Sequence, residues 1–598
     1  MRCEETKMFY LSISKILPAH WSGEKRMNIN QEIASIFYEM ADLLDILGVE
    51  WKPIAFRKAA RTIETYSKPI EELVKKKGIK GVMELPGIGE GIGKKIIEYV
   101  ETGKIKEYGE LKKKIPHGVE EMLNVPGLGP KKAAQLYKKL KIDSIEKLEK
   151  AVKGEKIRTL SGFGEKSEGD ILTGLAIVKK GMERKPIGMI LPYARSIVDE
   201  IKKIQGVTDA ELAGSLRRRK ETVKDMDIVV FTQNPEKVSK QLTKLREAKT
   251  VIRIGEKMTS VRFNNGLQSD MRMLSPELYG SGMVHFTGSK EHGIALRERA
   301  IKMGMKFSEY GLMKGKKIIA SKKEEDVYKG IKLPFIPPEL RENDGEIEAG
   351  EKGELPSLVE YNEIKGDVHV HTNWDDGRNT TEEMVKKAIS LGYEYVALTD
   401  HSPSDIIANG LSEKRIMKHW KEIEQLQKKY PKINILKGSE VAILKSGKLD
   451  FPDRILKELD IVIASIHSGF KNDTQTMTKR ITNALENEYV HFMGHPTGRL
   501  INKRNAYAFE LEKVLTTAEK NRKGMEINAQ PYRMDLNAQH VKECIRRKIP
   551  LFINTDSHSA EEMDYMTLGI GQARRGWAEK KDIVNSLLWK SFQKKIKR

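Results

Sequence analysis

The sequence predicts a multidomain protein of mixed α+β and α/β class, with helical modules first, a sheet-containing middle part and an α/β domain near the C-terminal end. From 28 to about 180 the apolar residues follow a helical period that Pro-Gly turns interrupt. From 187 to about 285 short β-rich runs appear, and after 363 apolar strand-like runs alternate with helical stretches. At ~150 residues per domain, a chain of 598 residues is expected to form several domains.

The charge balance points to a polyanionic partner. The formal net charge is +22 with a pI near 9.4, while 39% hydrophobic residues are enough for ordinary cores. A large protein this basic is typically a nucleic-acid binder. The alternative is a lysine- and glutamate-rich surface of the kind found in proteins from hot habitats. Charge by itself leaves both open.

The cysteines and the hydropathy bear on the compartment. Cys3 and Cys544 lie far apart, which indicates a reducing compartment without a disulfide framework. No apolar run approaches the ~20 residues that span a bilayer. We therefore expect a cytoplasmic protein with no membrane partner, and a monomer as the default state.

The helical part contains a repeated glycine turn. Leu-Pro-Gly-Ile-Gly at 85–89 and Val-Pro-Gly-Leu-Gly at 125–129 each precede a lysine-containing helix, and a weaker copy lies at 160–164. Glycines at such a turn bring backbone N–H groups and a helix N-terminus against a phosphate. The pattern resembles the helix-hairpin-helix motif, which grips a DNA backbone without reading its sequence, although a glycine here could also only cap a helix. The candidate DNA-binding residues are Gly87, Gly89, Gly127, Gly129 and Lys131.

The middle part holds a carboxylate constellation. Asp225 and Asp227 are two residues apart at the start of a strand-like run, so both point to one face and suit a pair of Mg²⁺ or Mn²⁺ ions. Asp270 supplies a third carboxylate on a later run. Three carboxylates beside a triphosphate cradle indicate nucleotidyl transfer. The expected cradle residues are Gly214, Ser215 and Arg218.

The C-terminal part holds nine candidate metal ligands, most of which follow an apolar run. They are His369, His371, Asp376, His401, Glu440, His467, His495, Asp556 and His558. The carboxyl ends of parallel strands meet at one face, so these side chains are expected to converge. Imidazole and carboxylate suit Mn²⁺, Zn²⁺ or Fe²⁺, and a set this large implies two or three ions. Paired metals activate water and clamp both oxygens of a phosphoester displacement.

Together these parts resemble a family X DNA polymerase, similar to DNA polymerase beta, joined to a PHP (polymerase and histidinol phosphatase) domain as in the bacterial and archaeal PolX proteins. The resemblance covers about 28–588 and includes Phe-Thr-Gly-Ser at 286–289 and all nine ligand positions. It implies helix-hairpin-helix modules, a nucleotidyltransferase palm with a thumb, and a distorted (β/α)7-type barrel. The implied domains are an uncertain extension at 1–27, a lyase-like helix-hairpin-helix domain at 28–108, fingers with helix-hairpin-helix at 109–182, the palm at 183–284, the thumb at 285–340, a linker at 341–362 and the PHP phosphoesterase at 363–588.

The resemblance also implies roles for polymerase residues. Asp225 and Asp227 would hold both palm metals, and Asp270 would hold the one near the primer 3′-OH. Phe286 and Gly288 would shape the nucleotide pocket. The resemblance further implies that Arg297 contacts the minor groove of the template. It also implies that Lys95 forms a Schiff base with an abasic sugar, the alternative being that Lys95 only contacts a phosphate.

For the PHP part, the resemblance implies two groups of ligands. One group is His369, His371, Glu440, His467 and Asp556, and the other is Asp376, His401, His495 and His558. Asp400 is expected to orient a ligand. Arg499 and Arg533 are expected, from their chemistry, to contact the scissile phosphate.

The chain departs from the family pattern at several positions. Arg219 and Lys224 stand where the family has glycine, and Gly293 stands where it has an asparagine facing the incoming base. Glu90-Gly91 replaces a threonine-glycine helix start. These changes imply weaker or less selective synthesis, whereas the metal-binding carboxylates are intact.

We therefore expect a polymerase that fills short gaps in primer-template DNA from deoxynucleoside triphosphates during repair. The PHP domain is expected to add 3′→5′ exonuclease activity, with abasic-site endonuclease or 3′-phosphatase activity as further options. The main alternative is a PHP nuclease whose polymerase half only holds gapped DNA. A small-molecule phosphatase and a non-catalytic DNA-binding scaffold are less favoured.

Overall fold

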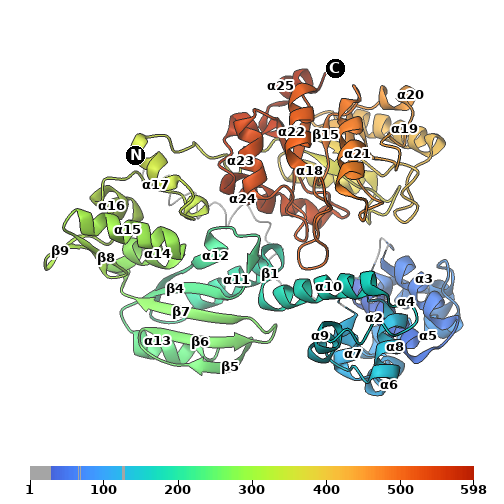
Figure 1. Cartoon of the computed structure of the whole chain (residues 1–598), viewed down its shortest axis with the longest axis horizontal. Coiled ribbons are helices and arrows are strands. Elements are labelled where there is room, and N and C mark those ends of the chain that lie inside the picture. The colour runs from blue at the N-terminus through green and yellow to red at the C-terminus, as the bar shows by residue number, and fades with distance from the viewer. Residues whose placement is uncertain (1–28, 65, 67–68, 124, 126–127, 598) are drawn as a thin grey trace. The chain divides into compact units, whose positions relative to one another are not determined.

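The structure is a computed structural model that describes residues 29–64, 66, 69–123, 125 and 128–597 (Figure 1). It divides into two compact units, one ending at Val178 and one beginning at Lys179. The expected extension at 1–27 and the candidate residue Gly127 lie outside the described residues. Among the described helices, none has the length and apolar character needed to cross a bilayer.

The first unit is helical and has one continuous core. Its helices are α2 (Ile29–Leu47), α3 (Lys52–Glu64), α4 (Ile70–Met83), α5 (Glu90–Thr102), α6 (Lys106–Lys114), α7 (His117–Met122), α8 (Pro130–Leu140), α9 (Ile145–Lys153) and the start of α10 (Glu165–Glu183). The glycine turns set where two of these helices begin, because Gly89 and Gly129 are the extended N-cap residues of α5 and α8. Backbone N–H groups at both starts are therefore left for a ligand.

The second unit begins with a mixed five-stranded sheet of order β2-β4-β7-β6-β5. Its strands are β2 (Val207–Leu212), β4 (Met226–Thr232), β5 (Ala248–Arg253), β6 (Met258–Phe263) and β7 (Gln268–Leu274). Only β4 and β7 run parallel to each other in this sheet. Alternate side chains of β4 enter two cores: one includes α11 (Ile187–Lys202) and α13 (Pro235–Leu242), and the other includes α14 (Tyr279–Thr287).

Short elements connect this sheet to its neighbours along the chain. α12 (Gly214–Arg217) lies between β2 and β4, and β1 (Lys185–Pro186) pairs with β3 (Thr222–Val223). Residues expected to form the thumb build α15 (Lys290–Lys302), β8 (Lys306–Ser308), β9 (Gly311–Lys314), β10 (Lys317–Ala320) and α16 (Glu324–Gly330).

The segment 341–362, predicted from its composition to be a linker, contains regular structure and buried charged side chains. It contains α17 (Glu346–Lys352), and Arg341 and Glu346 are fully buried. Arg341 donates a hydrogen bond to Glu324 at 2.8 Å, and Glu346 lies 2.6 Å from His292. Burial of these charges is tolerated because each has a partner, which a composition profile does not reveal.

The C-terminal part is a seven-stranded parallel sheet in sequential order. Its strands are β11 (Gly366–Val370), β12 (Tyr395–Leu398), β13 (Asn434–Ala442), β14 (Ile461–Ser465), β15 (Phe492–Met493), β16 (Gly524–Asn528) and β17 (Leu551–Asn554). A parallel bridge from Val370 to Ser557 brings the first strand beside the last, so the sheet is nearly closed. The expected (β/α)7-type barrel is confirmed.

Helices surround this barrel and cover one of its ends. They are α18 (Thr381–Ser390), α19 (Glu413–Lys429), α20 (Asp453–Leu456), α21 (Thr474–Glu486), α22 (Leu511–Lys520), α23 (Ala538–Arg546), α24 (Met566–Arg575) and α25 (Trp589–Ile596). Phe592 of α25 stacks on Tyr395, the first residue of β12, with ring centroids 4.0 Å apart. α25 therefore closes the end where strands begin and leaves the carboxyl ends to form the site.

Candidate metal centre and nucleotidyl-transfer site

All nine ligand positions predicted from the sequence lie at or just beyond the carboxyl ends of the barrel strands. His369, His371 and Glu440 are completely buried, and Asp556 is 3% exposed. Each neighbouring strand ends at the same face, so side chains that are far apart along the chain approach one another.

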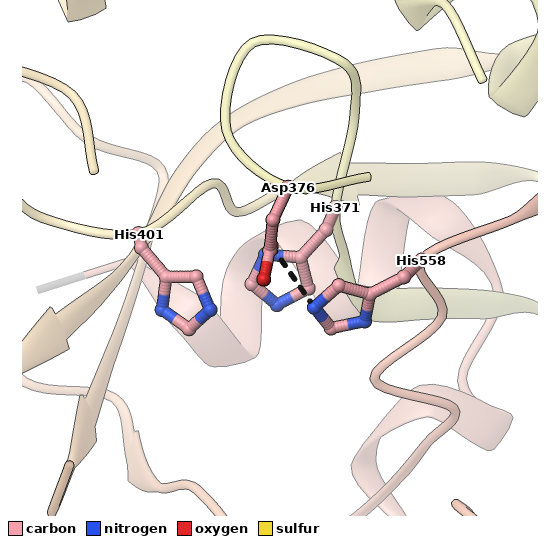
Figure 2. A group of neighbouring side chains, drawn as sticks. All are labelled: His371, Asp376, His401 and His558. Carbon is pink, nitrogen blue, oxygen red and sulfur yellow. Dashed lines mark ion pairs between the residues drawn. The ribbon is translucent and has the colours of Figure 1, made fainter. Parts of the chain in front are cut away.

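One group consists of His371, Asp376, His401 and His558, whose ligand atoms lie within 4.8 Å of one another. Figure 2 shows these side chains turned toward a common point, with the ion pair between His558 Nε2 and Asp376 Oδ1 at 3.2 Å. They come from the loops after β11, β12 and β17, which are adjacent because the barrel closes there.

Two further groups are linked to the first through shared ligands, His371 between the first and second groups and Glu440 between the second and third. One is His369, His371, Glu440 and Asp556, and the other is Glu440, His467 and His495. His495 Nε2 lies 2.7 Å from Glu440 Oε1, so His495 groups with Glu440 and His467, and not with the Asp376 group as the family pattern implied. The reason is strand order: β15, which precedes His495, is next to β14, which precedes His467.

The residues fit a set of divalent cations. Several buried atoms of these side chains have no hydrogen-bond partner in the described part of the chain: His369 Nε2, His371 Nε2, His401 Nδ1, Glu440 Oε2, His467 Nδ1 and His495 Nδ1. Buried polar atoms without partners are costly, and so many at one point indicate a site for positive ions. Imidazole nitrogen and carboxylate oxygen are the donors that Mn²⁺, Zn²⁺ and Fe²⁺ accept.

The electrostatics of the centre agree with this fit. Burial lowers the pKa of His369, but Glu526 and Asp556 outweigh it and raise that pKa well above its usual range. Burial likewise raises the pKa of Glu440, yet the surrounding histidines bring it well below its usual range. A proton on His369 thus helps to balance the carboxylates in the metal-free protein, and a bound cation must displace it.

Some residues of the centre were not predicted from the sequence. Glu526 Oε1 lies 2.7 Å from His369 Nδ1, and Asp375 Oδ2 lies 2.8 Å from His371 Nδ1. A carboxylate on the second ring nitrogen fixes the orientation of a histidine ligand. The available signal was a lone glutamate inside the apolar run Met-Glu-Ile and a second aspartate beside Asp376. Asp400, which was expected to orient a ligand, does not hydrogen-bond to a ligand ring as Glu526 and Asp375 do. It accepts a hydrogen bond from the backbone N–H of Thr372 at 2.7 Å, next to His371.

The two arginines expected near the scissile phosphate differ in their partners. Arg533 Nε lies 3.2 Å from Asp556 Oδ2, beside the centre. Arg499 instead pairs with Glu221 of the preceding domain, at 2.8 Å between Nη2 and Oε1. Arg533 is thus placed to meet a substrate, while Arg499 is already engaged.

The second carboxylate group lies on the mixed sheet. Asp227 of β4 and Asp270 of β7 are direct partners in the parallel ladder, and Asp225 immediately precedes β4. Burial, together with Asp225 and Asp270, raises the pKa of Asp227 to about 6. Gly214 packs against this carboxylate so closely that a β-carbon there would lie 1.9 Å from Asp227 Oδ2. Such clustering of like charges is typical of a cation site.

The expected triphosphate cradle surrounds Arg218, which is only 8% exposed. Its Nε donates to Glu342 at 3.0 Å and its Nη1 donates to the carbonyl of Thr287. Ser215 and Phe286 are half-buried near this region, and Gly288 has a φ of 67° with its backbone beside Arg218. Glu342 therefore holds the arginine that a triphosphate would require.

Two departures from the family pattern find partners in the structure. Arg219 has a φ of 57°, a conformation that favours the family's glycine, yet its side chain packs against Gly571 and its guanidinium lies 5.8 Å from the Tyr361 ring. A β-carbon on Gly293 would lie 3.4 Å from a terminal nitrogen of Arg297, so Gly293 places its backbone directly beside this arginine. Lys224 is exposed, and the structure gives no account of its substitution.

In the first unit, Gly87 has a φ of 76°, which places the turn before α5 in the left-handed region that glycine favours. Gly89 and Gly129 sit at helix starts, and Lys131 is exposed in the first turn of α8. Lys95 Nζ lies 2.8 Å from Glu107 and donates to the Gly91 carbonyl at 3.2 Å. The expected Schiff-base lysine is therefore in an ion pair.

Models of known families match four segments of the chain. They are a helix-hairpin-helix domain at 28–105, a SAM-like helix-hairpin-helix tandem at 119–179, a DNA polymerase beta thumb at 282–342 and a PHP domain at 367–530. The order of these matches is the order in which the sequence predicted the corresponding folds.

Curated relatives extend these matches. The chain is 39% identical to the DNA polymerase/3′-5′ exonuclease PolX of Bacillus subtilis (strain 168), over 95% of this chain and 99% of the relative. It is 36% identical to a probable phosphatase of Thermoanaerobacter sp. (strain X514), over 27% of this chain and 63% of that protein. It is 28% identical to a probable phosphatase of Acetivibrio thermocellus, over 33% and 80% respectively. Similarity across nearly the whole of both chains shows that this protein belongs to the PolX family, in which a family X DNA polymerase is joined to a PHP domain.

Proposed function

We propose that this protein is a DNA-directed DNA polymerase that fills short gaps and that also removes nucleotides from 3′ ends at its PHP centre. The observation that carries the proposal is the presence of two separate carboxylate centres in one chain whose whole length matches a DNA polymerase/3′-5′ exonuclease. A phosphatase acting on small molecules needs neither the aspartates of the mixed sheet nor the glycine turns of the first unit.

In the polymerase half, Asp225, Asp227 and Asp270 would hold Mg²⁺ or Mn²⁺, and Ser215 with Arg218 would bind the triphosphate. Because Gly214 has no side chain, the Asp227 carboxylate can pack directly against its backbone. The glycine turns of the first unit would hold the DNA backbone through exposed N–H groups, and the net charge of +22 favours that contact. Phe286 and Gly288 would border the nucleotide, and Arg297 the template.

In the PHP half, the three overlapping ligand groups would hold two or three Mn²⁺, Zn²⁺ or Fe²⁺ ions. When bound, such ions supply an activated water and neutralise the charge of the phosphodiester. Glu526 and Asp375 would keep His369 and His371 in the orientation that exposes their unpartnered nitrogens. Abasic-site endonuclease and 3′-phosphatase activities would use the same centre.

Lyase activity would use Lys95. Schiff-base formation needs a free amine, and Lys95 is ion-paired with Glu107 at 2.8 Å. DNA would have to separate this pair before the reaction. We also propose that the protein acts in the cytoplasm as a monomer, in keeping with its two cysteines, of which the described Cys544 is buried and unpaired.

A second candidate is a nuclease whose polymerase half only holds gapped DNA. The contact of Arg218 with Glu342 favours it, because the triphosphate must compete with a carboxylate for this arginine. Lys224 and Gly293 are the departures that would accompany a loss of synthesis.

The test uses one-nucleotide gapped DNA with a labelled primer and Mn²⁺, with and without deoxynucleotides. Extension with nucleotides and shortening without them support the proposal, whereas shortening in both lanes supports the nuclease alternative. Asp227→Ala should abolish extension and keep shortening, and Glu440→Gln should do the reverse. If Asp227→Ala still extends the primer, the assignment of the mixed-sheet site is wrong.

A further inference from the structure

A cavity of about 230 Å³ adjoins the PHP centre. Its lining includes two of the candidate ligands, Asp556 and His558, and three residues that are not ligands, namely Lys503, Tyr532 and Arg533. A substrate group bound in this cavity would therefore lie beside the metal site and beside two cationic side chains.

The two cations of the cavity have different surroundings. Arg533 lies 3.2 Å from Asp556 Oδ2, so one carboxylate of the centre already offsets its charge. Lys503 Nζ instead lies 3.8 Å from the centroid of the Tyr532 ring. Within the part of the chain that the structure describes, no carboxylate forms an ion pair with Lys503, and partial burial of its ammonium lowers its pKa. The lysine as a whole is exposed. An ammonium on an aromatic face, without an acid, has room for an anionic partner.

The backbone keeps Lys503 at this position. The loop after β15 turns back on itself, with the Lys503 N–H bonded to the Leu500 carbonyl at 2.9 Å and the Leu500 N–H bonded to the Arg504 carbonyl at 2.8 Å. Arg504 also donates twice to the Gly498 carbonyl, at 3.0 and 2.8 Å. The loop is thus tied at several points, and the lysine is presented by a built turn.

We propose that this cavity binds a backbone phosphate of the DNA strand that the PHP centre hydrolyses, with Lys503 as its main cationic contact and Arg533 as the second. Tyr532 supports Lys503 through its ring. This inference rests on the proposed nuclease function and assigns its substrate-binding cations. Lys503 thereby takes the phosphate-binding role that was expected of Arg499 from the sequence, because the Arg499 guanidinium is bound to Glu221.

Lys503 is the residue to test, because a change at Arg533 would also disturb the ligand Asp556. Lys503→Ala and Lys503→Arg are compared with Lys418→Ala, which removes an exposed lysine of α19 that does not line the cavity. The measurements are kcat and KM for degradation of single-stranded DNA over a range of salt concentrations, metal content, and primer extension.

Lys503→Ala is expected to raise KM on the order of ten-fold or more, with a smaller effect on kcat, because it removes a charge-assisted phosphate contact. Its activity should depend less on salt, since about one fewer counterion is released on binding. Lys503→Arg should stay near wild type, and metal content and extension should not change. Unchanged KM and salt dependence in Lys503→Ala would overturn the inference, as would loss of metal.

A terminal phosphate monoester has similar chemistry, so the substrate arms separate the two sources. DNA ending in a 3′-hydroxyl offers only phosphodiesters, and DNA ending in a 3′-phosphate offers both. If Lys503→Ala degrades the 3′-hydroxyl strand more weakly than wild type, the proposal is supported. If the variant is impaired only in removing the 3′-phosphate, the proposal is overturned. If wild-type protein degrades no DNA at all, the proposed nuclease function fails with it, a result distinct from normal degradation by Lys503→Ala.

Discussion

Arg499 of the PHP domain forms a two-bond ion pair with Glu221 of the mixed-sheet domain, at 2.8 Å between Nη2 and Oε1 and 3.1 Å between Nη1 and Oε2. Glu221 lies in the loop that leads from Arg218 to Asp225, and Gln572 also donates to it at 2.7 Å. Arg499 Nε in turn donates to the Arg533 carbonyl at 2.9 Å. The planar guanidinium of Arg499 therefore joins the loop beside the aspartates of the mixed sheet to the segment that borders the PHP metal centre.

This pair is expected to contribute a measurable coupling energy. Both side chains are mostly buried, at 17% and 26% exposure, so solvent screens the pair less than a surface ion pair. In a cycle of Glu221→Ala, Arg499→Ala and the double variant, thermal unfolding should give a coupling on the order of 1–2 kcal/mol. Strict additivity of the single variants would contradict the prediction.

The same pair predicts an asymmetry between the two activities. Glu221→Ala should reduce primer extension and leave exonuclease activity near wild type, because Glu221 lies in the polymerase loop and its carboxylate hydrogen-bonds to Arg499 and Gln572, neither of which is a candidate metal ligand. Arg499→Ala should reduce both activities, because it also releases the Arg533 carbonyl. Rates of extension and shortening on one gapped substrate measure this, and equal effects of the two variants on both rates would exclude it.

Gly214→Ala should abolish extension. Gly214 has a φ of 55°, and an added β-carbon would lie 1.9 Å from Asp227 Oδ2, so the carboxylate must move away from the metal site. The strained conformation adds a cost on the order of 1 kcal/mol or more. We expect extension to fall at least ~100-fold, because a misplaced carboxylate no longer orients the reacting groups.

The control for this variant is Gly169→Ala in α10, where a β-carbon meets nothing within 4 Å. It should fold and extend primers as wild type does. Exonuclease activity should survive in both variants. Normal extension by Gly214→Ala would show that Asp227 does not act in this conformation.

Asp227 should also make the metal-free protein less stable at neutral pH. Burial, Asp225 and Asp270 raise the folded-state pKa of Asp227 to about 6, from 3.8 in the unfolded chain. The folded protein therefore binds the proton more tightly, and the stability that this group contributes is lost as pH rises from ~4 to ~6. Asp227→Asn removes this effect, so in a chelator it should unfold at a higher temperature than wild type above pH 6.

The expected gain is on the order of 1–3 kcal/mol at pH 7.5 and should vanish near pH 4. Added Mg²⁺ should raise the unfolding temperature of wild type more than that of the variant. Asp326→Asn, at an exposed carboxylate of α16, serves as the control and should show no such pH dependence. A variant less stable than wild type at pH 7.5 would rule out a strained carboxylate cluster.

The candidate ligands could be located from the sequence because histidine is rare and because most of the ligands lie at or after the end of an apolar strand. The residues that orient them could not. Glu526 and His369 are 157 positions apart and meet only because β16 and β11 belong to one barrel. Local pattern contains no information on such a pair, so the lone glutamate of Met-Glu-Ile could not be matched to His369.

The same limit applies to the predicted linker and to the departures from the family pattern. Glu346 lies in the acidic segment predicted to be a linker, yet it is fully buried beside His292, a partner 54 positions away. Arg219 seemed only to replace a glycine, yet it packs on Gly571 of the PHP domain. Composition and periodicity describe neighbours in sequence, whereas these residues are explained by neighbours in space.

Glu526→Gln should weaken metal binding without removing any ligand. Glu526 Oε1 faces His369 Nδ1 at 2.7 Å, and its Oε2 accepts from the His495 backbone N–H at 2.6 Å. The amide keeps the shape but loses the charge that makes His369 a better donor and fixes its ring. We expect metal affinity to fall ~10–100-fold and exonuclease activity to recover at high Mn²⁺. The control is Glu424→Gln, at an exposed site on α19, which should bind metal with the affinity of wild type in a metal titration. Primer extension should be unaffected in both variants, since the palm carboxylates are separate. An activity loss in Glu526→Gln that Mn²⁺ does not restore, with metal content intact, would instead make Glu526 a participant in the reaction.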